Sequence, residues 1–234
     1  MLSVAFIPAR KGSKGLPGKN KKLFCGKPLI QWSIDQALES GCFDHVVVSS
    51  DDEDVIEIAK NYNSKKVIAH VRHEKLAQDD TVIDEVLYDF FARPEHECDV
   101  VCLLNPTSPL RLPEDISKMF KYIKMKKYWS VVSVQWCDFI GWVGKPTNKG
   151  PICSYNLSKR PNRQTRDDYF LENGSIFWFE HRILMAYGNM IGNPNKVKLY
   201  EMPRERSFEI DNEFDFWIAE RAYEYQHPSV ATAR

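Results

Sequence analysis

Continuous apolar runs divide the first part of the chain. They extend from Leu2 to Pro8, from His45 to Ser49, from Asp99 to Leu104 and from Trp129 to Val134. None of them shows the strict alternation of polar and apolar positions that a half-buried strand would have. Short apolar runs of this kind are typical of strands that are covered on both faces. We therefore predict four buried strands, the first of which ends at Pro8.

Between and after these runs, apolar residues recur at helical spacing. Ile30 and Ile34, for example, fall on one helical face, and Gly41 stands where a helix C-cap belongs. Helices are expected from Ile30 to Leu38, from Val55 to Tyr62, from Val82 to Phe90, from Pro113 to Ile123 and from about Asn212 to Ala222. Ser50 or Asp51 is the expected N-cap of the second helix. Because strands alternate with helices, we predict an α/β fold with a mostly parallel sheet and right-handed crossovers.

The pattern changes after Gln135. Residues 136 to 175 contain many Gly, Pro, Asn and charged residues with little periodicity, and strand character returns only at Ser175 to Phe179. A long irregular stretch inside a compact domain is usually functional or part of an interface. We expect one domain over residues 1 to 234, with 136 to 175 as an insertion.

Composition narrows the classes of partner. Hydrophobic residues make up 43% of the chain, and 32 Lys and Arg balance 32 Asp and Glu, so no overall field draws it to nucleic acid or to a membrane. No apolar stretch approaches the roughly 20 residues of a membrane span, and the N-terminal run lacks the basic leader of a signal peptide. The six cysteines are scattered without a CxxC pair, which argues against disulfides and zinc. We expect a cytoplasmic protein without an appended phosphatase or esterase domain. It would bind anionic substrates through local clusters of cations.

The segment IPARKGSKGLPGKN, directly after the first strand, forms such a cluster. It places Arg10, Lys11, Lys14 and Lys19 among Gly12, Gly15 and Gly18. Glycines let backbone N–H groups approach an anion, and the cations neutralise phosphate charge. Ligands of α/β folds bind at the carboxyl ends of the strands, where this loop would lie. A solvated basic turn is the alternative.

Two familiar phosphate-binding motifs do not fit this loop. A Walker A loop requires GxxxxGK followed by Ser or Thr, whereas the spacing from Gly12 to Gly18 is one residue too long and Asn20 follows Lys19. The dinucleotide fingerprint GxGxxG is also absent, which argues against a dinucleotide-dependent oxidoreductase.

The loop resembles the N-terminal signature IPARxGSKG…KN of the acylneuraminate cytidylyltransferases, the CMP-sialic acid synthetase family. Further segments are similar to the family in the same order: Ser49–Asp51 (SSD) to its strand-end Ser/Thr-Asp, Arg72–Asp79 (RHEKLAQD) to RPxxLAxD, Asn105–Arg111 (NPTSPLR) to QPTSPLR, Asn173–Phe177 (NGSIF) to NGAIF and Glu209–Asp211 (EID) to DID. The resemblance implies a Rossmann-like nucleotidyltransferase fold with a protruding dimerisation element. It also implies transfer of a nucleotide from CTP to a sialic-acid-like nine-carbon sugar acid, with release of pyrophosphate.

The resemblance also implies roles for individual residues. The nucleotide would be bound by Arg10, Gly12, Ser13, Lys14, Lys19 and Asn20 at the triphosphate and by Arg72 at the base. Catalysis would depend on Arg10, Lys19 and Asp211, with Asp211 and Glu209 holding Mg²⁺. Glu209 and Asp211 could both face one ion, because side chains at i and i+2 of an extended segment point the same way. Their carboxylates suit Mg²⁺, which prefers oxygen ligands. For Arg72 the alternative is a surface cation, and for Asp211 it is an acidic helix start, which suits Glu213 and Asp215 better.

The acidic sugar would face Asn105, Arg111, Arg163, Gln164 and Asn173 by the same resemblance. An Arg pairs bidentately with a carboxylate, and amides can bind hydroxyls. The family is typically a homodimer in which the irregular segment reaches toward the partner, so Arg163 would act across the interface. The alternative is a solvated loop arginine.

Departures from the family pattern leave the substrates open. Asn105 replaces Gln, Glu209 replaces Asp, and Val82 and Ile83 stand where many members carry small hydroxyl residues near the cytosine. The alternatives are another 2-keto sugar acid (3-deoxy-octulosonate, legionaminate or pseudaminate), GTP in place of CTP, or a noncatalytic nucleotide-binding regulatory protein.

Overall fold

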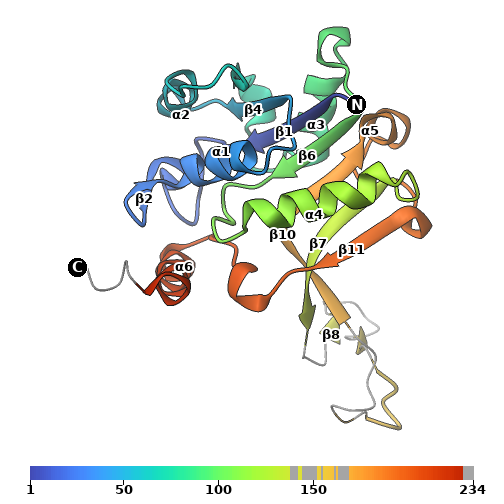
Figure 1. Ribbon diagram of the computed structural model, residues 1–234. Helices are drawn as coiled ribbons and strands as arrows, with labels where there is room; N and C mark the ends of the chain where they lie inside the picture. Colours follow the sequence, from blue (N-terminus) through green and yellow to red (C-terminus); the bar gives the residue numbers. More distant parts are fainter. Residues whose placement is uncertain (138–141, 144–151, 154, 161, 163–168, 229–234) are drawn as a thin grey trace.

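A seven-stranded sheet forms the centre of the protein, in the order β11-β7-β10-β6-β1-β4-β5 (Figure 1). The computed structural model describes residues 1–137, 142–143, 152–153, 155–160, 162 and 169–228. The strands of the sheet are β1 (Ser3–Pro8), β4 (His45–Ser50), β5 (Val67–Val71), β6 (Val100–Leu104), β7 (Ser130–Cys137), β10 (Tyr169–Glu180) and β11 (Val197–Glu201). All pairs are parallel except those of β10, which runs antiparallel to both β6 and β7.

Helices cover both faces of this sheet. On one face lie α1 (Leu29–Glu39), α2 (Glu53–Lys60) and α4 (Pro113–Lys124), which contribute Ile34, Val55 and Met119 to one apolar cluster. On the other lie α3 (Ile83–Phe91) and α5 (His181–Tyr187), which contribute Leu87 and Leu184 to a second cluster. Burial on both faces explains why the strand sequences are continuous apolar runs. The predicted fold class, an α/β fold with a mostly parallel sheet flanked by helices, is confirmed.

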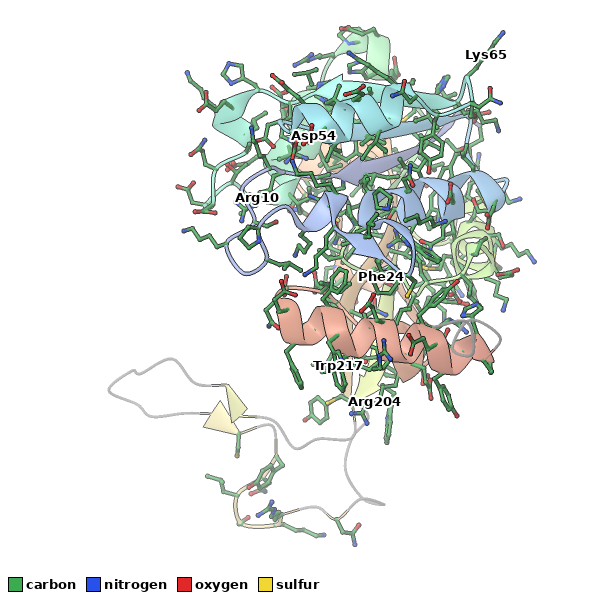
Figure 2. All side chains as sticks on the ribbon, turned by 90° about the vertical axis from the view of Figure 1, so that its left-hand side faces the viewer. Arg10, Phe24, Asp54, Lys65, Arg204 and Trp217 are labelled. Atoms are coloured by element: carbon green, nitrogen blue, oxygen red, sulfur yellow. The ribbon has the colours of Figure 1, made fainter. Side chains whose placement is uncertain are left out.

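A third apolar cluster lies at the carboxyl edge of the sheet, beyond the ends of β1 and β6, under α6 (Glu213–Gln226). The ring of Phe24 meets that of Phe216 edge-on at a centroid distance of 5.6 Å, and Leu16 and Ile210 are buried in the same cluster. Figure 2 faces this edge and shows Phe24 above α6. The cluster therefore holds the chain around Ile210 against the loop that follows β1.

Short elements complete the chain. β2 (Leu23–Phe24) pairs with β3 (Lys27–Pro28), and β8 (Trp142–Val143) pairs with β9 (Ile152–Cys153), both antiparallel. Single 3-10 turns occur at η1 (Lys19–Lys21), η2 (Glu74–Leu76), η3 (Pro94–His96), η4 (Pro194–Lys196) and η5 (Arg204–Arg206). All six cysteines are free thiols. In the part of the chain that the structure describes, no helix has the length and apolar content needed to cross a bilayer.

The predicted strands and helices are all present, but besides the two-residue strands and the 3-10 turns, β5, β11 and α5 were not foreseen. β5 and β11 are the two edge strands, and their burial is partial. α5 is only seven residues long, too short to show a helical period. The predicted cap of α2 is wrong: Asp52 caps the helix by accepting a hydrogen bond from the Asp54 amide. The Ser50 hydroxyl instead donates to the carbonyl of Ala9.

The predicted insertion is partly regular. β10 begins at Tyr169 rather than at Ser175, and its first residues pair with the end of β7, so that Tyr169 lies opposite Cys137. These two strand ends project from the body of the molecule toward β8 (Figure 1). The pairing between β7 and β10 shifts register between Glu172 and Phe177, where Gly174 adopts a φ of +66°. The bend therefore falls in the NGSIF segment.

Candidate active site

The glycine loop, defined here as residues 9–20, lies at the carboxyl edge of β1 and β4. Its start is fixed by a hydrogen bond from the Ala9 amide to the Ser49 carbonyl (2.9 Å) and by one from the Lys11 amide to the Asp51 carboxylate (2.8 Å). Its end is fixed by the Asn20 side-chain amide, which donates to the carbonyl of Arg10 (3.1 Å). Figure 2 faces this edge and shows Arg10 in the loop, with α6 below it.

The loop contacts the segment that carries Asp211. A Cβ on Gly15 would lie 2.3 Å from the Asp211 carbonyl oxygen, so only glycine allows this approach. The Lys19 ammonium donates to the Ile210 carbonyl (2.6 Å) and lies 3.3 Å from the Asp211 carboxylate. The side chain of Lys19 is 10% exposed, whereas that of Asp211 is 71% exposed. Cations of the loop and the carboxylate of Asp211 thus lie on the same side of the molecule.

Glu209 and Asp211 flank the buried Ile210. The pKa of Glu209 is raised above its ordinary value, first because the carboxyl group is desolvated and second because the charge of Asp211 is near. The Thr107 hydroxyl donates to Glu209 at 3.2 Å. Asp215 has a different function: its carboxylate accepts from the backbone amides of Asp211 and Asn212, which caps α6. The alternative interpretation, an acidic residue at the start of a helix, therefore applies to Asp215 and not to Asp211.

The carboxylate pair fits a magnesium ion. The charge of Asp211 makes it harder to ionise Glu209, and a divalent cation would relieve this cost. The described residues hold no group of three or more His, Cys, Asp or Glu side chains arranged for a metal. Mg²⁺ usually takes only one or two carboxylates and completes its shell with phosphate oxygens and water. Asp211, with Glu209 beside it, would therefore hold the ion together with a bound phosphate.

Two cations of the loop are paired with a carboxylate from a distant segment. Asp79 accepts from the Arg10 guanidinium at 2.7 Å and from the Lys14 ammonium at 2.5 Å. Arg10 also donates to the carbonyl of Gln78 at 3.2 Å. Both cations remain partly exposed, at 34% for the side chain of Arg10 and 79% for that of Lys14. Their charges are therefore available to a ligand that can displace Asp79.

Arg72 is not a surface cation. The residue is 6% exposed, and its guanidinium donates to the hydroxyl (3.2 Å) and the carbonyl (2.9 Å) of Ser49, at the end of β4. Burial lowers its pKa to about 10, with Asp51 acting to raise the pKa and Arg10 to lower it. The guanidinium therefore stays charged at neutral pH and lies within the field of the loop. Its predicted contact with the base stays a prediction.

Two of the residues predicted to face the sugar are internal. Arg111 is 1% exposed and donates to the carbonyls of Asn105 (2.7 Å) and Ser175 (3.2 Å) and to the hydroxyl of Ser33. Asn173 is 4% exposed. Both side chains are engaged with partners inside the protein, and their predicted contact with the sugar stays a prediction. Buried backbone groups need partners, and Arg111 supplies one to the Asn105 carbonyl while the Asn173 side-chain oxygen supplies one to the Ser175 amide.

Asn173 uses both ends of its amide inside the protein. Its oxygen accepts from the hydroxyl of Ser133 (2.6 Å), and its nitrogen donates to the hydroxyl of Ser207 (3.0 Å). Asn105 is only partly buried, and its amide donates to the Gly174 carbonyl (2.6 Å), which ties the 105–111 turn to the bend in β10. Whether Asn105 also binds substrate stays a prediction.

The remaining predicted residues divide into two groups. Gly12 is exposed and Ser13 partly buried in the glycine loop, in positions open to a ligand. Arg163 and Gln164 lie outside the described residues. Sequence reasoning missed two features of the site, the contact of Gly15 with Asp211 and the pairing of Asp79 with the loop cations. The loop pattern did contain Gly15, and Asp79 ends the RHEKLAQD segment, but neither pattern indicated the partner of its residue.

Comparison with known protein families shows which family has this sequence pattern. The model of a family described as cytidylyltransferases matches residues 4–227. The chain belongs to the cytidylyltransferase family. The resemblance seen in the glycine loop therefore extends over nearly the whole chain.

Individual relatives of this cytidylyltransferase-family chain differ in length. It is 36% identical to N-acylneuraminate cytidylyltransferase A of Danio rerio over 93% of the chain but only 50% of that protein. The chain thus spans about half the length of the fish relatives that it matches. It is 33% identical to CMP-N,N'-diacetyllegionaminic acid synthase of Legionella pneumophila, and the match covers 98% of the chain and all (100%) of that protein. A pseudaminic acid cytidylyltransferase of Campylobacter jejuni is 30% identical with the same coverage, 98% and 100%.

Solved structures agree on the fold. A CMP:2-keto-3-deoxy-manno-octonic acid synthetase complexed with CTP superposes with a TM-score of 0.68 at 18% identity, over 97% of this chain and 100% of the other. A 4-diphosphocytidyl-2C-methyl-D-erythritol synthase of Anaerococcus prevotii superposes with a TM-score of 0.62 at 13% identity, over 95% and 98%. At these identities the likeness shows the fold alone.

Proposed function

We propose that the chain transfers a cytidylyl group from CTP to the hydroxyl of a sialic-acid-like nonulosonic acid and releases pyrophosphate. The observation that carries the proposal is the contact between the glycine loop and Asp211, with the Lys19 ammonium between them. It joins a cationic, glycine-lined anion site to an exposed carboxylate. Nucleotidyl transfer requires this combination, because the reaction depends mainly on positioning and on neutralising charge.

Each part has a role in the proposed reaction. The anomeric hydroxyl of the sugar gives up its proton to solvent as its oxygen bonds to the α-phosphorus of CTP, the bond from that phosphorus to the oxygen bridging to the β-phosphate breaks, and pyrophosphate leaves. Arg10, Lys14 and Lys19 hold the phosphates, and the backbone of Gly12 and Ser13 lines the same loop. Asp211 and Glu209 would hold Mg²⁺, which would supply positive charge against the phosphates and would lower the pKa of the attacking hydroxyl. Lys19 stabilises the charge that develops on the departing pyrophosphate.

We propose the chemical class of the sugar substrate and not one particular sugar. The relatives named for N-acylneuraminate, N,N'-diacetyllegionaminate and pseudaminate are 36%, 33% and 30% identical to the chain, values too similar to separate the three. All three names denote nine-carbon acidic sugars, so a carboxylate is the feature that the site would have to recognise. A 3-deoxy-octulosonate is the alternative within the same chemistry. A panel of nucleoside triphosphates and sugar acids, with mass spectrometry of the product, identifies the pair.

We further propose a cytoplasmic homodimer. Free thiols at all six cysteines are typical of a reducing compartment. The projecting ends of β7 and β10 give a second copy of the chain a surface to pair with (Figure 1). Sedimentation equilibrium would test the dimer.

The reaction is tested with two variants. Arg10→Ala and Asp211→Asn should each abolish CTP-dependent and sugar-dependent release of pyrophosphate while the circular dichroism spectrum stays unchanged. Arg204→Ala is the matched control, because Arg204 is exposed in η5. Full activity in either site variant would contradict the mechanism. Binding of CTP by the wild type without any release of pyrophosphate would favour the noncatalytic regulatory protein.

A further inference from the structure

Asp79 bridges two cations that the proposed reaction needs for phosphate. One carboxylate oxygen lies 2.7 Å from the Arg10 guanidinium, and the other lies 2.5 Å from the Lys14 ammonium. The pKa of Asp79 is lowered below its ordinary value, first by the hydrogen bond from Lys14 and then by the one from Arg10. Each oxygen of one carboxylate thus pairs with a different cation, as two oxygens of a phosphate group would.

This contact is formed by the fold and not by neighbouring residues. Asp79 and Arg10 are 69 positions apart in the sequence. The segment that carries Asp79 is anchored at its start by Arg72, which is buried against Ser49. Near its end the Gln78 side chain donates to the carbonyl of Glu74 (2.8 Å). The Arg10 guanidinium also donates to the Gln78 carbonyl (3.2 Å), so this contact is exchanged together with the ion pairs. Because the anchor at Arg72 does not depend on the loop cations, the segment can release Arg10 and Lys14 without losing its place in the fold.

The ion pairs of Asp79 are weak enough to be exchanged. The Asp79 side chain is 45% exposed, and exposed ion pairs contribute little to stability because water screens the charges and ordering the side chains costs entropy. A triphosphate carries several charges and can contact both cations together with the backbone N–H groups of the loop. It therefore replaces a single carboxylate at little cost, and the carboxylate can return when the anion leaves.

We infer that Asp79 is an internal anion that competes with the polyphosphate for Arg10 and Lys14. The inference rests on the proposed function, since it gives the same loop a phosphate ligand. In the empty protein Asp79 holds both cations in position and keeps them from binding other anions. When pyrophosphate has formed, Asp79 reclaims the two cations and speeds the release of the product. Asp79 thus lowers the affinity of the site for CTP and for pyrophosphate.

Removal of the competing charge provides the test. We compare the affinity of the wild type, Asp79→Asn and Asp80→Asn for inorganic triphosphate and pyrophosphate by calorimetry at fixed, low ionic strength. Asp80 is the matched control because it is exposed and adjacent to Asp79, and among the described residues no hydrogen bond or ion pair joins its side chain to the loop cations. Asp79→Asn should bind both anions about three- to tenfold more tightly, the range expected when two exposed ion pairs no longer have to be broken. Asp80→Asn should change the affinity by less than about twofold.

The opposite results are equally distinct. Weaker binding by Asp79→Asn would show that Asp79 positions the cations for phosphate, and equal effects of the two variants would show only a change in net charge. Either result overturns the inference. A second measurement is hydrogen exchange: CTP should slow the amides of residues 10–19 and speed those of residues 78–80. Slowing of both segments would also overturn the inference.

The inference and the proposed function can fail separately. If the wild type binds triphosphate more weakly than Asp79→Asn but never releases pyrophosphate from CTP, the competition stands and the proposed reaction fails. If the wild type turns over CTP and Asp79→Asn binds no more tightly, the reaction stands and the competition fails.

Discussion

The backbone of Gly15 contacts the carbonyl oxygen of Asp211, and a Cβ at position 15 would lie only 2.3 Å from that oxygen. The two residues belong to segments at opposite ends of the chain. Their contact is supported by Lys19, whose ammonium binds the carbonyl of Ile210 (2.6 Å), and by the apolar cluster of Leu16, Phe24 and Ile210. The glycine is therefore required by a close approach of two backbones and not by its own conformation.

Gly15→Ala should separate the glycine loop from Asp211. The new methyl group cannot fit against a backbone carbonyl, so one of the two segments must shift, at a cost of about 1–3 kcal/mol for overpacking. Because a displacement of about 1 Å can reduce a rate by roughly 100-fold, kcat/KM should fall at least tenfold. Gly12→Ala is the matched control for stability, since a Cβ there meets nothing within 4 Å. A Gly15→Ala protein with wild-type activity and an unchanged Tm would refute the close contact.

Arg111→Met should unfold the protein more readily without changing substrate recognition directly. The substitution removes the side-chain donor of the Asn105 and Ser175 carbonyls, which keep one backbone amide each (from Ser108 at 3.2 Å and from Asn105 at 3.4 Å), and the expected loss is about 1–3 kcal/mol in the free energy of unfolding. Urea denaturation measures it. Arg204→Met removes an exposed guanidinium and should cost less than about 0.5 kcal/mol. If Arg111→Met kept full stability and only the KM for the sugar rose, the structural role would be contradicted and the predicted contact of Arg111 with the sugar would be supported.

Glu209→Gln should stabilise the metal-free protein at neutral pH. Folding raises the pKa of Glu209, through desolvation and through the charge of Asp211, so the folded state prefers the protonated carboxyl group. This contribution favours the folded state below the ordinary pKa of 4.5 and is lost as the pH rises through the higher pKa of the folded protein. At pH 7.5 the ionised carboxylate is therefore a cost, which the amide removes.

Thermal unfolding at several pH values checks this sign. The Tm of Glu209→Gln should exceed that of the wild type at pH 7.5 without divalent cations, and the difference should shrink as the pH falls below 4.5. Added Mg²⁺ should raise the Tm of the wild type more than that of the variant, because the carboxylate is a predicted ligand. Glu201→Gln, at an exposed position of β11, should show neither effect. A lower Tm for Glu209→Gln in the absence of metal would contradict the electrostatic account.

Much of the fold could be predicted from the sequence. Continuous apolar runs identified β1, β4, β6 and β7, because a strand covered on both faces needs apolar residues at every position. The start of α6 at Asn212 was also predictable, since a capping residue acts on amides only two and three positions away. The edge strands β5 and β11 escaped prediction because partial burial leaves a mixed pattern.

The features of the site also fall into those that the sequence predicts and those that only the fold creates. By itself, the sequence determined that cations and glycines are grouped in one loop after β1, because a loop of adjacent residues stays together in any fold. Only the tertiary structure decided that Gly15 contacts Asp211, that Asp79 pairs with Arg10 and that Arg111 is turned inward. Local patterns determine the type of an element and its buried face, whereas the partner of a charged side chain depends on which distant segments the sheet brings together.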